Sequence, residues 1–132
     1  MDITPLIPEN RQIIQSYSPG KFKINGSVYD QPIFILPEQT LLWDAPVAFD
    51  ELSKGHFIAP FNELAEDYHI DILLLGTGET GKFLPPSLNI DLKKEGLSIE
   101  SMNTGAACRT YNVLMAEGRQ IAAFLLPLPR SE

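Results

Sequence analysis

The sequence predicts an α/β fold in a single domain covering residues 1–132, with an N-terminal β-rich half and a C-terminal half in which strands and helices alternate. A length of 132 residues suits one domain with a substantial core. Short β-type runs separated by turn residues fill residues 11–45, which predicts antiparallel strands. Across residues 70–126, apolar runs of strand length alternate with helical patterns, which predicts a parallel β-α-β-α-β portion within a mixed sheet.

The first elements are short strands. In "FKINGSVYD", Asn25-Gly26 lies between two β-type runs and predicts a tight hairpin. "QPIFILP" and "TLLWDA" predict two further short strands. Between residues 47 and 68 we expect two short helical pieces, the first ended by Gly55 and the second begun near Pro60.

The later elements are longer and more regular. "IDILLL" is a continuous apolar run, typical of a strand covered on both faces. A helix is expected from Pro86 to Glu95 with Gly96 as its stop, followed by the strand "LSIESM". Thr104 is expected to cap a second helix that ends at Gly118, and "QIAAFLLP" predicts the last strand.

A glycine-rich loop, "GTGETGK" at residues 76–82, follows the buried strand and formally matches two phosphate-binding patterns. Phe83 occupies the position where a Walker loop needs a hydroxyl, and Pro85-Pro86 delay the helix whose amides should face a phosphate. The dinucleotide pattern needs an acid at a strand end, whereas Glu100 falls inside "LSIESM". The loop is therefore better explained as a surface turn built with glycine.

Ligands favour the carboxyl edge of a parallel sheet, which the loop 76–85 should share with the segment 103–105. The start of the second helix would place Thr104 there, and Arg109 could reinforce its preference for anions. Cys108 is open to two interpretations: a thiol activated by the helix, or an inert thiol beside the apolar stripe. Arg109 likewise either contacts a ligand or partner, or forms a local pair.

The second helix has a sparse polar face. Between residues 105 and 116 its only charged side chain is Arg109, and Val113 lies away from the main apolar stripe. A fully solvated face would carry more charge. We therefore expect another element of the chain, or a partner, to cover part of this face.

Composition excludes several classes of function. The net charge of −7 argues against nucleic acid and anionic membrane surfaces as partners. Cys108 is the only cysteine, and His56 and His69 lack a ligand pattern, so we expect no disulfide, metal or cofactor. No run approaches the length of a membrane span, and the first residues suggest neither secretion nor import, so a cytoplasmic location is expected.

Four blocks, "LLLGTG", "FLPP", "TGAACRTYNVL" and "EGR", occur in an order and spacing that resembles a known family. That family comprises small α/β proteins related to mitochondrial respiratory complex I assembly factor 3. The resemblance is strong over residues 70–126. It implies a three-layer fold with a mixed sheet and no established enzymatic activity. Gly81-Lys82 departs from the family pattern, which weakens a phosphate role for Lys82.

The signature residues that this resemblance carries over hold no catalytic assignment. They are Gly76, Thr77, Gly78, Phe83, Pro85, Pro86, Thr104, Ala107, Cys108, Arg109, Thr110, Tyr111, Asn112, Glu117, Gly118 and Arg119.

Two hypotheses for function follow. The first is a non-enzymatic interaction or assembly-factor-like protein that binds an unidentified protein partner, with a homo-oligomer left open. The alternative is a small-molecule or anion-binding protein, an enzyme among the options, that uses the loop at residues 76–81 and the helix start at 104–109. The candidate binding residues are Gly76, Thr77, Gly78, Thr104, Cys108, Arg109, Tyr111 and Asn112.

Overall fold

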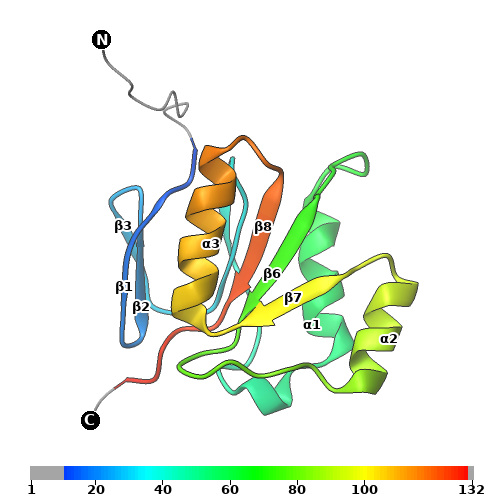
Figure 1. Ribbon diagram of the computed structural model, residues 1–132. Coiled ribbons are helices and arrows are strands. Elements are labelled where there is room, and N and C mark those ends of the chain that lie inside the picture. The colour runs from blue at the N-terminus through cyan, green and yellow to red at the C-terminus, as the bar shows by residue number, and fades with distance from the viewer. Residues whose placement is uncertain (1–10, 131–132) are drawn as a thin grey trace.

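Residues 11–130 are described by the structure, a computed structural model (Figure 1). It contains two sheets. The strands of the first are β1 Ile14–Ser18, β2 Lys21–Ile24 and β3 Ser27–Tyr29. The strands of the second are β4 Ile33–Ile35, β5 Thr40–Leu42, β6 Ile72–Gly76, β7 Ile99–Met102 and β8 Ile121–Leu125. The helices are η1 Phe49–Glu51, α1 Lys54–Ile58, η2 Ala59–Glu63, α2 Pro86–Lys94 and α3 Thr104–Ala116.

The expected mixed sheet is confirmed. Its strand order is β5-β4-β8-β6-β7, with β6 parallel to both β7 and β8 and with β4 antiparallel to β5 and β8. The segments β6, α2, β7, α3 and β8 follow one another along the chain, which is the predicted β-α-β-α-β portion. Strands β5 and β7 form the two open edges of this sheet.

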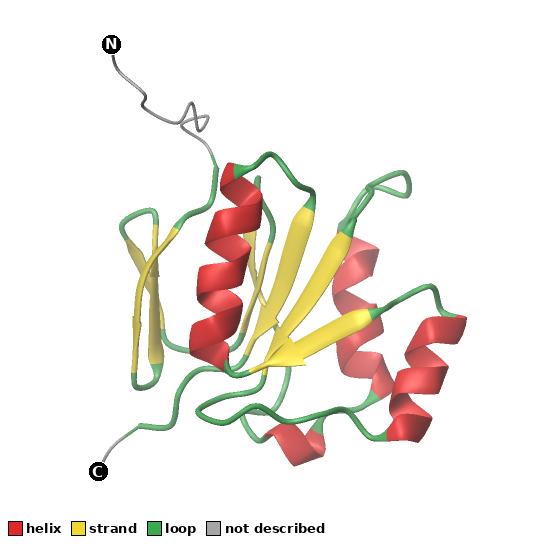
Figure 2. Ribbon diagram, in the orientation of Figure 1, coloured by secondary structure: helices red, strands yellow, loops and turns green. Residues whose placement is uncertain are grey.

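The five-stranded sheet is covered on both faces, as the run "IDILLL" predicted. Figure 2 shows α3 on one face and α1 and α2 on the other. Side chains of β6 alternate accordingly, because Leu74 belongs to the core under α3 while Leu73 and Leu75 belong to the core on the opposite face. On that opposite face, Phe124 stacks on Phe34 with ring centroids 4.3 Å apart. These layers make β6 and β8 the centre of the fold.

The N-terminal strands form a separate antiparallel sheet of order β1-β2-β3. The predicted hairpin joins β2 to β3: Asn25 and Gly26 have φ angles of +48° and +85°, as a tight hairpin turn requires. This sheet lies alongside α3 (Figure 1), with Phe22 and Ile24 buried in the same core as Tyr111 of α3 and Leu74 of the larger sheet. It therefore covers part of the sparsely charged helix face, although Val113 is still 59% exposed.

Two predicted helix boundaries are wrong. Gly55 does not end a helix but lies inside α1, which begins after Ser53, whose backbone N–H donates to His56 Nδ1 at 3.0 Å. The side chain of His56 therefore caps the start of α1. The helix begins one residue before Gly55, which was expected to end a helix. Thr104 is not the cap of α3; Asn103 is, since its Oδ1 accepts from the backbone N–H of Ala106 at 2.8 Å.

The other stops are confirmed. Helix α2 begins at Pro86 and is followed by Gly96 with a φ of +83°, and α3 is followed by Gly118 with a φ of +82°. Both glycines adopt the left-handed conformation that commonly terminates helices.

Candidate functional site

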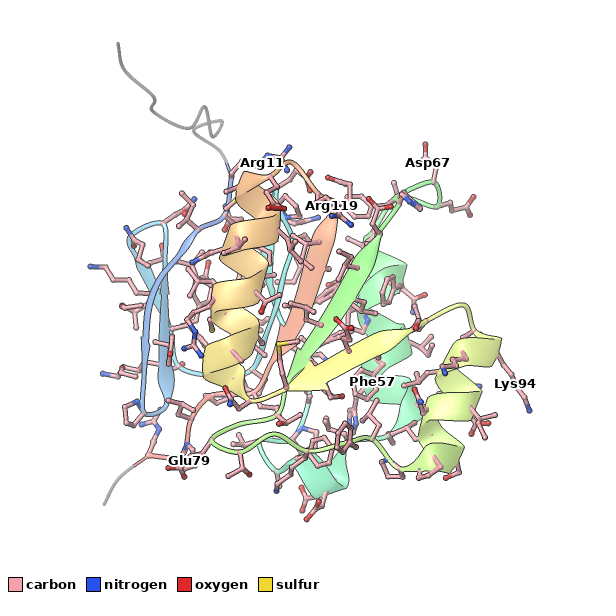
Figure 3. The ribbon with its side chains drawn as sticks, in the orientation of Figure 1. Arg11, Phe57, Asp67, Glu79, Lys94 and Arg119 are labelled. Atoms are coloured by element: carbon pink, nitrogen blue, oxygen red, sulfur yellow. The ribbon has the colours of Figure 1, made fainter. Side chains whose placement is uncertain are left out.

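The glycine loop closes directly onto the start of α3. Thr77 N–H donates to Met102 O at 2.9 Å, and Thr104 N–H donates to Gly78 O at 2.8 Å. Thr77 Oγ1 donates to Thr80 O at 2.7 Å and accepts from the N–H of Lys82 at 3.2 Å. In Figure 3 the loop residue Glu79 lies at the end of the sheet opposite Asp67. The loop and the helix start do share one edge, as expected, but their polar groups bond to each other.

Thr104 joins three segments of the chain at this edge. Its side-chain hydroxyl donates to Leu126 O at 2.6 Å and accepts from the N–H of Gly78 at 2.8 Å. The residue is fully buried. A hydroxyl with both a donor and an acceptor partner in a water-free environment has little capacity left for a ligand. Thr104 therefore ties β6, α3 and the chain after β8 together.

The three glycines of the loop have different roles. Only Gly78 has a positive φ, +101°. A Cβ at Gly76 would lie 3.0 Å from the backbone of Thr104 and 3.0 Å from the side chain of Leu125, so this glycine permits close packing. Gly81 has neither constraint. Of the three glycines, only Gly78 is therefore explained by the need for a turn with positive φ.

The ammonium group of Lys82 lies against an aromatic ring and not at the loop amides. Its Nζ lies 5.6 Å from the centre of the Phe49 ring, which is a cation–π distance. Phosphate binding by such a loop needs a lysine directed at the phosphate and a helix that begins at the loop. Here the lysine contacts Phe49, and α2 begins only at Pro86.

The other four candidate residues face β1 along α3. Arg109 donates from a guanidinium nitrogen to Tyr17 Oη at 2.8 Å. A Cβ on Gly105 would lie only 2.7 Å from Tyr17 Oη, which is too close, so this glycine makes room for the tyrosine. Arg109 is therefore held toward the small sheet, and no hydrogen bond among residues 11–130 joins it to the glycine loop.

Asn112 and Tyr111 bind the backbone of the N-terminal segment. Asn112 Oδ1 accepts from Ile14 N–H at 3.0 Å, while its Nδ2 donates to Ile14 O at 2.8 Å. Tyr111 Oη donates to Gln12 O at 2.9 Å. Burial raises the pKa of the Tyr111 phenol, which therefore stays a protonated donor at any ordinary pH. Since β1 is an edge strand of the small sheet, Asn112 provides partners for both backbone groups of Ile14 at that edge.

Cys108 is a free, buried thiol. Its side chain is 1% exposed, and burial raises its pKa to about 12, an effect that Arg109 only partly opposes. A thiol that stays protonated is a poor nucleophile. Of the two interpretations left open by the sequence, the structure therefore supports the buried one.

Alkylation of Cys108 by iodoacetamide at pH 8 is expected to be about a thousandfold slower in the native protein than in guanidinium chloride, because that is the loss of thiolate when the pKa rises to about 12. Because the folded state holds the thiol proton more tightly than the unfolded state, the free energy of unfolding falls as the pH rises from the ordinary thiol pKa to about 12. The measurement is the rate of mass gain in intact protein. A native rate within tenfold of the unfolded rate would contradict the buried thiol.

The eight candidate residues thus fall into two groups. Gly76, Thr77, Gly78 and Thr104 close the edge of the large sheet. Cys108, Arg109, Tyr111 and Asn112 lie along the contact between α3 and β1. A depression of about 330 Å³ lies beside the second group and is lined by Ile14, Gln15, Ser16, Tyr17, Cys108, Arg109 and Asn112. A binding role for the eight residues stays a prediction, since the contacts above are all within the chain.

Several residues that matter here were missed. Asn103 could have been found, because asparagine is among the best caps and precedes the helical pattern directly. Gln12, Ile14 and Tyr17 had no local signal, as they meet α3 from more than ninety residues away. Phe83 was noted for its place in the signature and for what it denies a Walker loop, but not as a candidate binding residue, yet 90% of it is exposed.

Residues 11–130 contain neither a cluster of metal-binding side chains nor a helix that could cross a membrane. No cluster of three or more His, Cys, Asp or Glu side chains could hold a metal ion within that range. Within the same range, no helix combines the length and the apolar character that crossing a bilayer requires.

Known proteins share both the sequence and the fold. An uncharacterized protein of Rhodobacter capsulatus is 36% identical, with 88% of this chain and 85% of that protein aligned. A Danio rerio protein named NADH dehydrogenase [ubiquinone] 1 alpha subcomplex assembly factor 3 is 35% identical over 89% of this chain, which spans only 65% of its relative's length. The crystal structure of a Bordetella parapertussis protein superposes with a TM-score of 0.75 at 30% identity, covering 89% of this chain and 96% of that one.

The match to a family extends over most of the chain. Residues 14–126 fit the family described as "Protein of unknown function (DUF498/DUF598)", and this range runs from the first residue of β1 to just beyond β8. The match includes the glycine loop, the whole of α3 and the N-terminal strands that α3 holds. The chain belongs to this DUF498/DUF598 family and is related to the proteins named complex I assembly factor 3.

Proposed function

We propose that this protein is a non-enzymatic, assembly-factor-like protein that binds a protein partner. Two lines of support converge on it. Most signature residues form contacts within the chain that explain their presence structurally. These residues therefore do not form a group of free reactive side chains. Relatives carry the name of an assembly factor for NADH dehydrogenase. A cytoplasmic location and the oligomeric state stay predictions.

The observation that carries the proposal is the exposure of Phe83. It is the large apolar side chain of the signature that packing within residues 11–130 leaves exposed, because 90% of it is in solvent. Two prolines follow at residues 85 and 86, and Leu84 beside it is buried, so the aromatic ring is displayed from an anchored segment. Aromatic side chains that are exposed and anchored are typical centres of protein interfaces.

Phe83 also lies on a groove at an open sheet edge. The β7 groove, as we name it, has a volume of about 240 Å³ and is lined by Phe83, Leu84, Asn89, Ile99, Glu100 and Ser101. Three of these residues belong to β7, the outermost strand on that side. An outermost strand presents backbone N–H and C=O groups that another chain can pair with. We infer that an extended segment of the partner adds to β7 and places an apolar side chain against Phe83.

The test compares Phe83→Asp with Val28→Asp, a matched control because Val28 is a 62% exposed apolar residue on the small sheet. Tagged full-length protein is expressed in its own source cells, crosslinked, purified and quantified by mass spectrometry. We expect Phe83→Asp to lower the recovery of a crosslinked partner by at least about tenfold, while Val28→Asp leaves it unchanged. Equal recovery with all three proteins, each shown by circular dichroism to be folded, would overturn the proposal.

The alternative of an anion-binding protein has no observation in its favour within residues 11–130. The backbone N–H groups of Thr77, Gly78 and Thr104 are already bonded within the chain, and Arg109 is held against Tyr17. Cys108 is buried with a raised pKa. We therefore place the function in binding of a protein and not in chemistry.

A further inference from the structure

A second groove lies at the opposite edge of the large sheet, far along the sheet order from β7. The β5 groove, as we name it, is lined by Leu42, Trp43, Asp44, His56, Ala59, Pro60 and Glu63, with a volume of about 140 Å³. Its apolar surface comes from the end of β5 and from η2, and its polar groups are two carboxylates and an imidazole. None of these residues belongs to the β7 groove or to the contacts of α3.

The floor of the β5 groove is rigid. Trp43 is 2% exposed, and its indole Nε1 donates to His56 O at 2.8 Å. The same ring packs on Phe57 and Phe124, with centroids 5.5 Å and 4.7 Å away. Figure 3 shows Phe57 behind the sheet, on the side of α1. A groove that needs no rearrangement before binding loses little affinity to ordering its own side chains.

One wall of the groove is an unpaired strand edge. Within residues 11–130, strand β5 pairs with β4 alone, and Leu42, which lies opposite Ile33 in that pair, is 56% exposed. Natural edge strands are usually protected by charge or proline where no partner is meant to bind. Here an exposed leucine ends the strand, which favours an extended segment as the occupant.

The charge around the groove defines the chemistry of that segment. Between residues 44 and 71 the chain has seven carboxylates and one lysine, a net charge of −6 out of −7 for the whole sequence. The acids are Asp44, Asp50, Glu51, Glu63, Glu66, Asp67 and Asp71. Asp44 and Glu63, the two in the groove, form no ion pair with any other residue in the range 11–130. A second copy of the chain would bring like charges together, so it fits this surface poorly.

We propose that the β5 groove binds an extended basic segment of a partner protein. An arginine of that segment lays its aliphatic stem over Leu42 and Pro60 and directs its guanidinium to the carboxylates of Asp44 and Glu63. Arginine suits this site because its stem packs on apolar surface while its planar head bonds carboxylates. The open edge of β5 pairs with the backbone of the same segment. Since β5 and β7 are opposite edges of one sheet, this site is independent of the β7 groove and of the function proposed there.

The test is a titration of the full-length, ¹⁵N-labelled protein followed by NMR. The probe is a synthetic peptide of alternating arginine and valine, and the comparison peptide has citrulline in place of each arginine. We expect the arginine peptide to shift the amide signals of residues 40–44 and 56–63, and the uncharged citrulline peptide to bind at least about tenfold more weakly.

Two double variants separate a specific site from a general attraction. Asp44→Asn with Glu63→Gln removes the carboxylates of the groove and is expected to weaken the peptide at least about tenfold. Asp50→Asn with Glu51→Gln removes the same charge from the neighbouring η1 and is expected to change affinity less than about twofold. Leu42→Ser, which removes the apolar wall, is expected to weaken binding as well.

Three results would each overturn the proposal. Equal weakening by the two double variants would mean that the peptide senses only the overall field of the acidic segment. Shifts confined to residues outside 40–44 and 56–63 would place the peptide elsewhere. Shifts at these residues that grow with protein concentration in the absence of peptide would identify a second copy as the occupant.

Discussion

Replacing Thr104 with valine is expected to lower the free energy of unfolding by about 2–5 kcal/mol, because it leaves two buried backbone groups without partners. Valine matches the shape of threonine, so the change removes the hydroxyl and little else. The N–H of Gly78 loses its acceptor, and the carbonyl of Leu126 loses its donor. Both lie where Thr104 is fully buried, so water cannot replace the hydroxyl without opening the edge. Chemical denaturation followed by circular dichroism measures the change.

The matched control is Thr110→Val, which alters a half-buried threonine two turns along the same helix. Its cost is expected to stay within about 0.5 kcal/mol, as for most partly exposed sites. Equal costs for the two variants would mean that the Thr104 hydroxyl does not join the glycine loop to α3. A large loss at Thr104 alone would explain why the loop and the helix start occur together in the sequence signature.

The C-terminal half could be predicted because each of its elements carries a local signal. Apolar runs marked β6 and β8, and the apolar stripes of α2 and α3 ended at glycines that do adopt positive φ. Parallel pairing then follows from the alternation of strand and helix. The hairpin at Asn25-Gly26 was equally local.

The position of the small sheet on α3 could not be predicted. Its hydrogen bonds join residues more than ninety positions apart, and their acceptors and donors are mostly backbone atoms, which every residue has. The two wrong helix boundaries have a similar origin. Gly55 was judged by its residue type, whereas the capping side chain of His56 decides where α1 begins. Thr104 was predicted to cap α3, but its hydroxyl instead forms tertiary hydrogen bonds with Gly78 and Leu126.

The candidate site shows the same ambiguity between binding and structure. Polar residues such as Arg109 and Asn112, near a helix start beside a glycine loop, are typical of ligand sites, and sequence alone cannot reveal that Tyr17 and the backbone of Ile14 occupy them. Phe83, the residue with the clearest case for binding, has no charged or reactive group that would mark it as a site residue in the sequence. Its exposure became visible only once the positions of β7 and α2 were known.

Replacing Asn112 with alanine is expected to lower the free energy of unfolding by about 2–4 kcal/mol, since both backbone groups of Ile14 lose their partners at once. The small sheet is otherwise held by the bonds of Tyr111 to Gln12, Arg109 to Tyr17 and Gly20 N–H to Leu128 O, and by the buried side chains of Ile14, Phe22 and Ile24. Loss of the Asn112 contact should therefore loosen β1, β2 and β3 before the rest of the fold. Hydrogen exchange is expected to accelerate about tenfold or more in residues 13–29 and to stay unchanged in β6 and β8.

The control is Asn89→Ala on α2, which removes a half-buried asparagine of another helix and is expected to leave exchange in residues 13–29 unchanged. If Asn112→Ala accelerates exchange uniformly in both sheets, then the small sheet and the large sheet unfold as one cooperative unit, and the asparagine contributes only to overall stability. If exchange rises in residues 13–29 alone, α3 is a platform from which the N-terminal sheet can detach. The surface bearing Tyr111 and Cys108, buried in the native state, would then be exposed in a partly unfolded form.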